Sequence, residues 1–92
     1  MSQIRWSEAC DRNRAPILAV LQRHLADRHR VLEIGSGTGQ HAEYFAAALP
    51  HLQWQATDHP DLLPGIAERL QAAGLPNAPA PWPLQAVLSP TP

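Results

Sequence analysis

The chain has 92 residues, 45% of them hydrophobic, and a formal net charge of −1, which excludes disorder along its whole length. A chain of this length forms one small domain at most. Its single cysteine, Cys10, excludes an internal disulfide and fits a reducing compartment. No segment is apolar and long enough to span a bilayer, and no secretory signal opens the chain. We therefore expect a cytoplasmic protein that does not associate with membranes.

Charged residues are distributed unevenly along the chain. Residues 5–30 carry six arginines against three acidic residues, whereas the remainder has one arginine against five. The two signs are interspersed, as is typical of solvated helix faces. The sequence has no basic stripe with interleaved aromatic residues, which argues against a nucleic-acid partner. The five histidines lack the spacing of metal ligands, so we expect no metal site.

The N-terminal third predicts helical structure. Ser7 is a candidate cap for a short helical turn through Asp11, and Asn13 is a candidate N-cap for a second helix with Pro16 in its first turn. The second helix has one apolar face, made by residues at helical spacing: Ile17, Leu18, Leu21 and Leu25.

A short apolar strand over residues 31–34 ends in the glycine-rich sequence Gly35-Ser36-Gly37-Thr38-Gly39. The residues that follow have helical spacing, and Pro50 closes this helix. Its apolar positions are Ala42, Phe45, Ala46 and Leu49.

A second strand follows, with apolar residues at alternate positions from Leu52, and it ends at Asp58. A third helix is expected with Asp61 as its N-cap, Pro64 in its first turn and Gly74 as its left-handed stop. Its buried stripe is made by Leu63, Ile66, Ala67 and Leu70. We expect the three tryptophans, Trp6, Trp54 and Trp82, to be packing residues.

The alternation of helices and strands predicts an α/β fold: a Rossmann-like parallel sheet with flanking helices and right-handed crossovers. Residues 76–92 differ, because they hold six of the ten prolines and no charge. A short third strand is expected over residues 84–88, restricted by Pro81 and Pro83 to a strand start or an edge.

The glycine turn is the most informative element for function. Glycines allow a tight turn and let a ligand lie against the main chain, while the next helix presents free N–H groups to it. Asp58 comes nineteen residues after Gly39, at the end of the next strand, where a carboxylate can accept both hydroxyls of a ribose. The two features together predict a nucleoside site.

The spacing of the turn narrows the choice of nucleoside. Gln40 stands where a dinucleotide fingerprint needs a third glycine, and no Gly-Lys-Ser/Thr follows as in a P-loop. An acid two residues before a Gly-x-Gly-x-Gly turn resembles the first motif of class I S-adenosylmethionine-dependent methyltransferases. The resemblance implies that the turn with Gly35, Ser36, Gly37 and Gly39 faces the methionine part of the cofactor. It also implies that Glu33 holds the amino group and Asp58 the ribose.

Further segments resemble one family in that superfamily, a methyltransferase-like family of undefined function found in bacteria and animals. These segments are Ala9–Asn13 with Pro16–Leu18, Val31–His41, Phe45, Leu49-Pro50 and Trp54-Gln55. The likeness places Arg12 and Asn13 near the cofactor or acceptor, although helix capping explains Asn13 equally well. Family members are longer and usually read Leu-Asp-Val where this chain has Leu84-Gln85-Ala86-Val87.

From this departure we expect residues 1–84 to be the N-terminal part of a class I methyltransferase domain, truncated or changed in frame near Gln85, and residues 85–92 to be a divergent, mobile tail. The methyl acceptor is unknown, and a small molecule is favoured over nucleic acid. The open alternatives are a nicotinamide-binding Rossmann protein, a decayed fragment without function, and a non-catalytic module that self-associates through the free edge of its first strand. Structural alternatives are an arginine partner for Glu33 and a turn-capping role for Asp58.

Overall fold

The computed structural model describes Ser2 and residues 4–84. Its elements, in chain order, are α1 (Glu8–His24), β1 (Arg30–Ile34), α2 (Gln40–Ala48), β2 (Gln53–Asp58), the 3-10 turn η1 (Pro60–Leu62), α3 (Leu63–Ala73) and β3 (Trp82–Pro83). The strands form one parallel sheet in the order β1-β2-β3. This is the Rossmann-like α/β fold that the sequence predicts.

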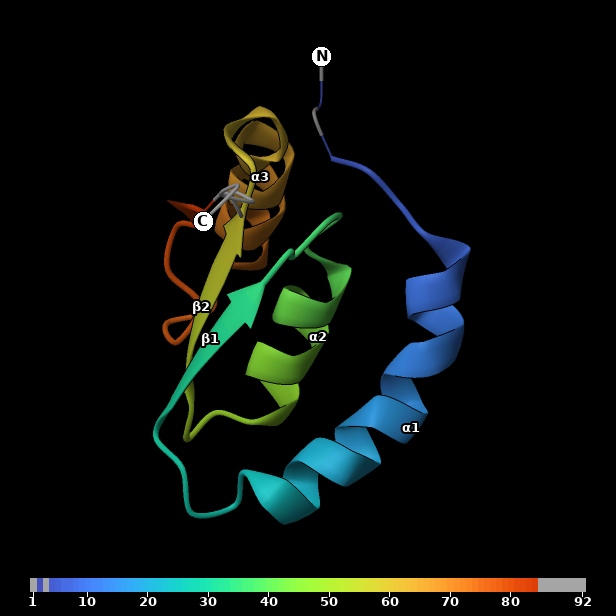
Figure 1. Ribbon diagram of the computed structural model, residues 1–92, viewed down its shortest axis with the longest axis vertical. Helices are drawn as coiled ribbons and strands as arrows, with labels where there is room; N and C mark the ends of the chain where they lie inside the picture. Colours follow the sequence, from blue (N-terminus) through green and yellow to red (C-terminus); the bar gives the residue numbers. More distant parts are fainter. Residues whose placement is uncertain (1, 3, 85–92) are drawn as a thin grey trace, which may run out of the picture.

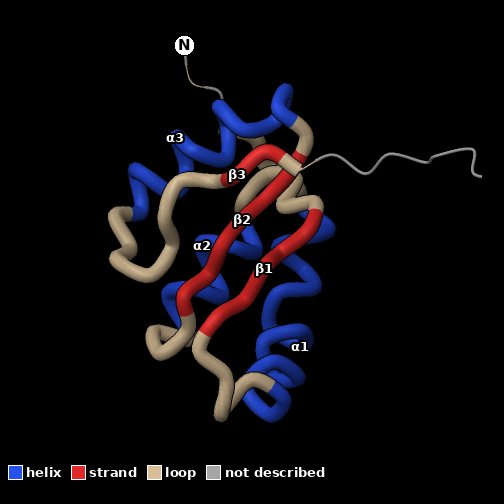
Figure 2. The backbone as a smooth tube through the Cα atoms, turned by 60° about the vertical axis from the view of Figure 1, so that its left-hand side comes forward, coloured by secondary structure: helices blue, strands red, loops and turns tan. Residues whose placement is uncertain are grey.

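The three helices lie behind the sheet in Figure 2, and no helix among residues 4–84 covers the face of the strands toward the viewer, here called the bare face. The core fills the space between the helices and the sheet. Its buried members are Ala42, Phe45, Ala46, Leu49, Leu52, Trp54, Ala56, Ile66, Leu70 and Ala78. No helix in the described part of the chain is long and apolar enough to cross a membrane.

The N-terminal region forms one helix where the sequence predicts two. Ser7 is the N-cap, because its hydroxyl accepts a hydrogen bond from the Cys10 N–H at 3.3 Å. Asn13 and Pro16 lie inside α1, so the predicted N-cap at Asn13 is wrong. A proline removes one helical hydrogen bond, and α1 bends along its length in Figure 1. After Pro16 the helix is held by apolar side chains that pack against the core, Ile17, Leu18 and Leu21. Before it, the Ser7 carbonyl oxygen accepts a hydrogen bond from Gln40 Nε2 of α2.

The start of α3 also differs from the prediction. Asp61 lies in η1, where its N–H donates to Nδ1 of His59 at 3.1 Å, and no side chain caps α3. The predicted cap at Asp61 is therefore wrong, because a 3-10 turn leads directly into the helix. Gly74 ends α3 with φ of 64°, as predicted.

The third strand begins two residues earlier than predicted, at Trp82. Pro83 is paired with Asp58, and a proline is tolerated there because β3 is the last strand of the described sheet. The Leu84 N–H donates to the Asp58 carbonyl oxygen at 2.9 Å. Residues 85–88 of the predicted strand, and the mobile tail predicted over residues 85–92, lie outside the described residues.

The bare face of the sheet carries large apolar side chains. Register places Leu32 beside Gln55, Ile34 beside Thr57 and Thr57 beside Trp82, so these residues share one face. Exposed fractions there are 56% for Leu32, 72% for Ile34 and 59% for Trp82. Of the tryptophans predicted to pack, Trp54 is buried, whereas Trp6 and Trp82 are exposed.

Buried Asn77 joins the loop after α3 to the end of α2. Its Nδ2 lies 2.9, 3.3 and 2.8 Å from the carbonyl oxygens of Ala46, Leu49 and Leu52. We expect Asn77→Ala to lower the free energy of unfolding by about 1–3 kcal/mol, because these oxygens lose their donor. Urea unfolding followed by circular dichroism measures the loss. Exposed Asn13 is the control, and an Asn13→Ala loss of equal size would contradict the assignment.

Candidate functional site

The turn between β1 and α2 lies at the carboxyl end of the sheet and owes its shape to three glycines. Gly35, Gly37 and Gly39 have φ of 76°, 60° and 81°, values that side chains disfavour. A Cβ on Gly39 would meet Arg69 Cδ at 3.3 Å, so this glycine permits close packing against α3. A Cβ on Gly35 or Gly37 would meet nothing within 4 Å. The space over these two glycines is therefore open to a ligand.

The carboxylate of Glu33 supports the turn from β1. Its Oε1 accepts hydrogen bonds from the Ser36 hydroxyl at 2.6 Å and from Trp54 Nε1 at 3.2 Å. Glu33 forms no ion pair with an arginine within the described ranges, so that alternative is wrong. Its role toward a cofactor amino group stays a prediction.

Ser36 connects the turn with β2. It is buried, its hydroxyl accepts from the Thr57 N–H at 3.1 Å, and its own N–H donates to the Thr57 carbonyl oxygen at 2.8 Å. The Thr57 hydroxyl donates to the Glu33 carbonyl oxygen at 2.5 Å. These bonds hold the first part of the turn rigidly across the ends of both strands.

Asp58 meets the turn from the end of β2. Its Oδ2 accepts from the Gly37 N–H at 2.7 Å, and its Oδ1 accepts from the His59 N–H at 2.6 Å. Asp58 therefore contacts the glycine turn and also makes a contact of the turn-capping kind expected as its alternative, while its role toward a ribose stays a prediction. Because a carboxylate oxygen has two lone pairs, each oxygen keeps capacity for a further donor such as a ribose hydroxyl.

Arg12 and Asn13 occupy exposed positions of α1. Arg12 forms an ion pair with Glu8 at 3.9 Å, and both side chains are mostly exposed. None of the hydrogen bonds found among the described residues joins Arg12 or Asn13 to the glycine turn. Their placement near a cofactor stays a prediction from the resemblance.

Sequence reasoning missed Arg69 of α3 as a contributor to the site. Its Nε donates to the Thr38 carbonyl oxygen at 3.0 Å, its NH1 to Glu43 at 3.0 Å, and its NH2 to the Arg5 carbonyl oxygen. Arg69 thus joins the glycine turn, α2 and the segment before α1. Its one visible signal was that it is the single arginine of the acidic part of the chain.

Gln40 is the second contributor to the site that sequence reasoning missed. In the sequence it served only as evidence against a dinucleotide site. The Ser7 N–H donates to its Oε1, and its Nε2 donates to the Ser7 carbonyl oxygen at 3.0 Å. This pair holds the N-terminal segment beside the turn. A small cleft there is lined by Arg5, Gly37, Thr38, Asp61, Leu62 and Gly65.

A parallel Rossmann-like sheet with an open glycine turn and a carboxylate at the end of the neighbouring strand defines the class of this protein, and it is compatible with a nucleotide cofactor. The chain belongs to the family described as "Protein of unknown function (DUF938)", whose model matches residues 4–92. That description assigns no activity. No solved structure matches the chain.

Proposed function

We propose that the chain is a cytoplasmic S-adenosylmethionine-binding protein of the class I methyltransferase type. The observation that carries the proposal is the Asp58 carboxylate held on the Gly37 N–H, beside the open space over Gly35 and Gly37. A purine nucleoside that carries an amino-acid group suits both the carboxylate and the open turn. The Asp58 carboxylate can accept ribose hydroxyls, and the open turn can admit the methionine chain.

Different residues of the site are proposed to bind different groups of the cofactor. The first N–H groups of α2 and the positive end of its dipole favour a carboxylate lying over the turn. Glu33, fixed by Ser36 and Trp54, places a negative charge near the same turn, where an ammonium group is favoured. When bound, the cofactor supplies a sulfonium methyl group for displacement. The protein is proposed to raise the rate of transfer by holding the acceptor in line with that methyl group. The acceptor is proposed to be a small molecule.

A nicotinamide dinucleotide is the main alternative ligand. It is disfavoured because Gln40 occupies the third glycine position of that fingerprint and its side chain is held by Ser7. Thermal unfolding with S-adenosylhomocysteine, NAD⁺ or ATP distinguishes the candidates. A ligand at 100 times its dissociation constant stabilises the fold by about 2.7 kcal/mol, so we expect a higher Tm with S-adenosylhomocysteine alone. A shift with NAD⁺ and none with S-adenosylhomocysteine would overturn the proposal.

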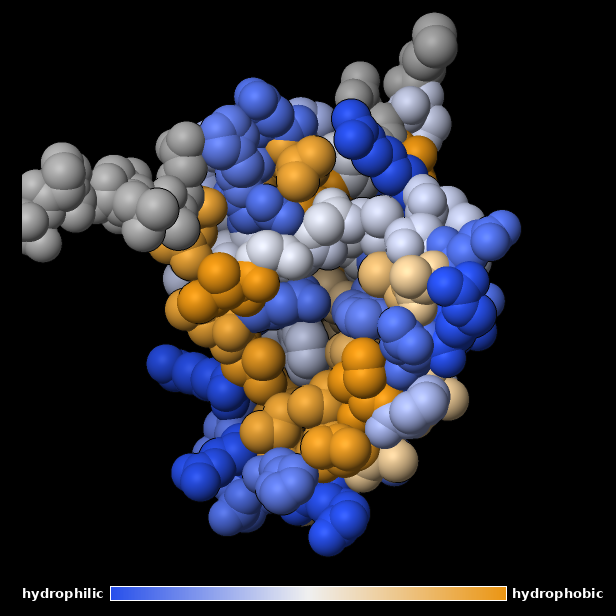
Figure 3. All heavy atoms as spheres, turned by 45° about the vertical axis from the view of Figure 1, so that its right-hand side comes forward, coloured by the Kyte–Doolittle hydropathy of each residue, from blue (hydrophilic) through white to orange (hydrophobic). Residues whose placement is uncertain are grey.

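Self-association is a second candidate function, favoured by the uncovered sheet. Among the described residues β1 pairs with β2 alone, and parallel sheets are ordinarily covered on both faces. On the side of the molecule drawn in Figure 3, a band of apolar side chains runs down to the lower end of α1. If the β1 strands of two chains paired antiparallel about Leu32, the Leu32 side chains of the two copies would lie opposite each other.

Sedimentation velocity tests this second candidate. We expect the mean sedimentation coefficient to rise with concentration, and Leu32→Glu to abolish the rise because it places two like charges opposite each other. Val20→Glu is the matched control, since Val20 is also about half exposed but lies on α1. Monomer at all concentrations, or the same loss with Val20→Glu, would contradict pairing through this edge.

A further inference from the structure

A separate hollow of about 480 Å³ lies on the side of α2 that faces away from the sheet. The residues of α2 that are buried in the core, such as Ala42 and Phe45, alternate with those that line the hollow, such as Glu43 and Ala47. Its volume is in the range of small-molecule sites. It shares no lining residue with the cleft beside the glycine turn.

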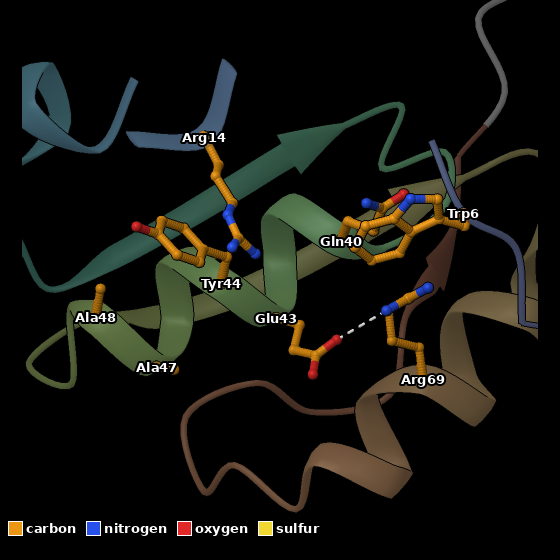
Figure 4. Close-up of a pocket in the computed structure, with 8 residues that line it drawn as sticks. All are labelled: Trp6, Arg14, Gln40, Glu43, Tyr44, Ala47, Ala48 and Arg69. Atoms are coloured by element: carbon orange, nitrogen blue, oxygen red, sulfur yellow. Dashed lines mark hydrogen bonds and ion pairs between the residues drawn. The ribbon is translucent and has the colours of Figure 1, made fainter. Parts of the chain in front are cut away.

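Two aromatic side chains line the hollow, and each has a guanidinium group against its ring (Figure 4). Arg14 Cζ lies 4.6 Å from the centre of the Tyr44 ring, and Arg69 Cζ lies 5.8 Å from that of Trp6. Such cation–π contacts fix the position of the guanidinium groups. The lining therefore brings together positive charge and exposed aromatic surface from three elements and the N-terminal segment.

The two arginines differ in what they offer a ligand. The Arg69 side chain is only 11% exposed, and each of its three nitrogens already donates one hydrogen bond, to Glu43 or to a carbonyl oxygen. The Arg14 side chain is 43% exposed, and its ion pair with Asp11 is made by NH1 at 3.3 Å. The rest of the Arg14 guanidinium can donate to a bound anion in the fork geometry that suits a carboxylate.

The other residues that line the hollow indicate what kind of group should carry the negative charge of the ligand. Trp6 is 59% exposed, so its indole is available for stacking, and Ala47 and Ala48 contribute only methyl groups. The negative charge of Glu43 is compensated by Arg69 at 3.0 Å. Arg14 is paired with Asp11 through NH1, and its other N–H groups are the donors that remain for an acidic group. A planar apolar ligand with one acidic group complements the indole, the methyl groups and the Arg14 guanidinium.

We propose that this hollow is a binding site for a small aromatic carboxylate, whose ring stacks on Trp6 and whose acid group pairs with Arg14. The proposal does not rest on the cofactor function, because Trp6 and Arg14 do not line the cleft beside the glycine turn, although Gln40 and Arg69 adjoin both places.

Calorimetric titration of the full chain with 1-naphthoate tests the proposal. We expect saturable binding with one site, weakened about tenfold or more by Arg14→Gln, since a hydrogen bond to a charged group is lost. Trp6→Leu should weaken it as well. Arg23→Gln, an exposed substitution on the same helix, should leave the dissociation constant unchanged.

The neutral analogue 1-naphthamide is the ligand control, and circular dichroism verifies that each variant is folded. Weaker binding of the amide than of the carboxylate supports the role of Arg14. The proposal is overturned if 1-naphthoate does not bind saturably, if folded Arg14→Gln binds it as the parent does, or if the amide binds equally well.

Discussion

Gly37→Val is expected to abolish S-adenosylhomocysteine binding in a chain that still folds. The φ of 60° at Gly37 is a left-handed conformation that costs a residue with a side chain roughly 1–2 kcal/mol. The added side chain would also enter the open space in which the ligand is proposed to lie. The Gly37 N–H bonded to Asp58 would shift if the backbone relaxed to a negative φ.

Gly74→Val is the matched control for this experiment. Gly74 has φ of 64° and nothing within 4 Å of an added Cβ, so the two substitutions carry similar strain at different places. Urea unfolding should show a similar loss of stability in both variants, and calorimetry should show loss of binding only for Gly37→Val. Parent-like affinity of a folded Gly37→Val chain would remove the glycine turn from the binding site.

Asp58→Ala is expected to weaken binding of S-adenosylhomocysteine by about 1.5–3 kcal/mol, the size of a hydrogen bond to a charged group. The carboxylate is proposed to accept ribose hydroxyls, and it also holds the Gly37 N–H at 2.7 Å. Both losses act in the same direction, because an unanchored turn must be ordered again on binding.

Two further variants separate these effects. Asp58→Asn keeps an acceptor oxygen and removes the charge, so its affinity should lie between those of the parent and Asp58→Ala. Asp27→Ala removes an exposed carboxylate between α1 and β1, and its affinity should equal that of the parent. An unchanged dissociation constant in Asp58→Ala would exclude Asp58 from the site.

The elements that the sequence predicted well are those with a strong local signal. A strand that ends just before Gly35 and a strand that ends at Asp58 are marked by residues that must turn or end an element. The N-terminal helix was divided wrongly because Asn13 and Pro16 imitate a helix start. Tertiary contacts outweighed this local preference, since the part after Pro16 packs against the core and Ser7 is bonded to Gln40. Asp61 likewise resembles a helix start in the sequence, but it lies in the 3-10 turn η1 that leads into α3.

The meeting of Glu33, Gly37 and Asp58 could be predicted because the carboxyl ends of adjacent parallel strands lie at one edge of a sheet. The contributions of Arg69 and Gln40 could not. Arg69 bonds to Thr38 across 31 positions, and Gln40 bonds to Ser7 across 33, so both depend on how helices and the N-terminal segment pack.

Calorimetric titration of the folded chain with S-adenosylhomocysteine tests the central claim most directly. We predict saturable binding of one ligand per chain, lost in Gly37→Val and retained in Gly74→Val. A folded chain that releases no binding heat at any temperature tested, and whose Tm the ligand does not raise, would contradict it.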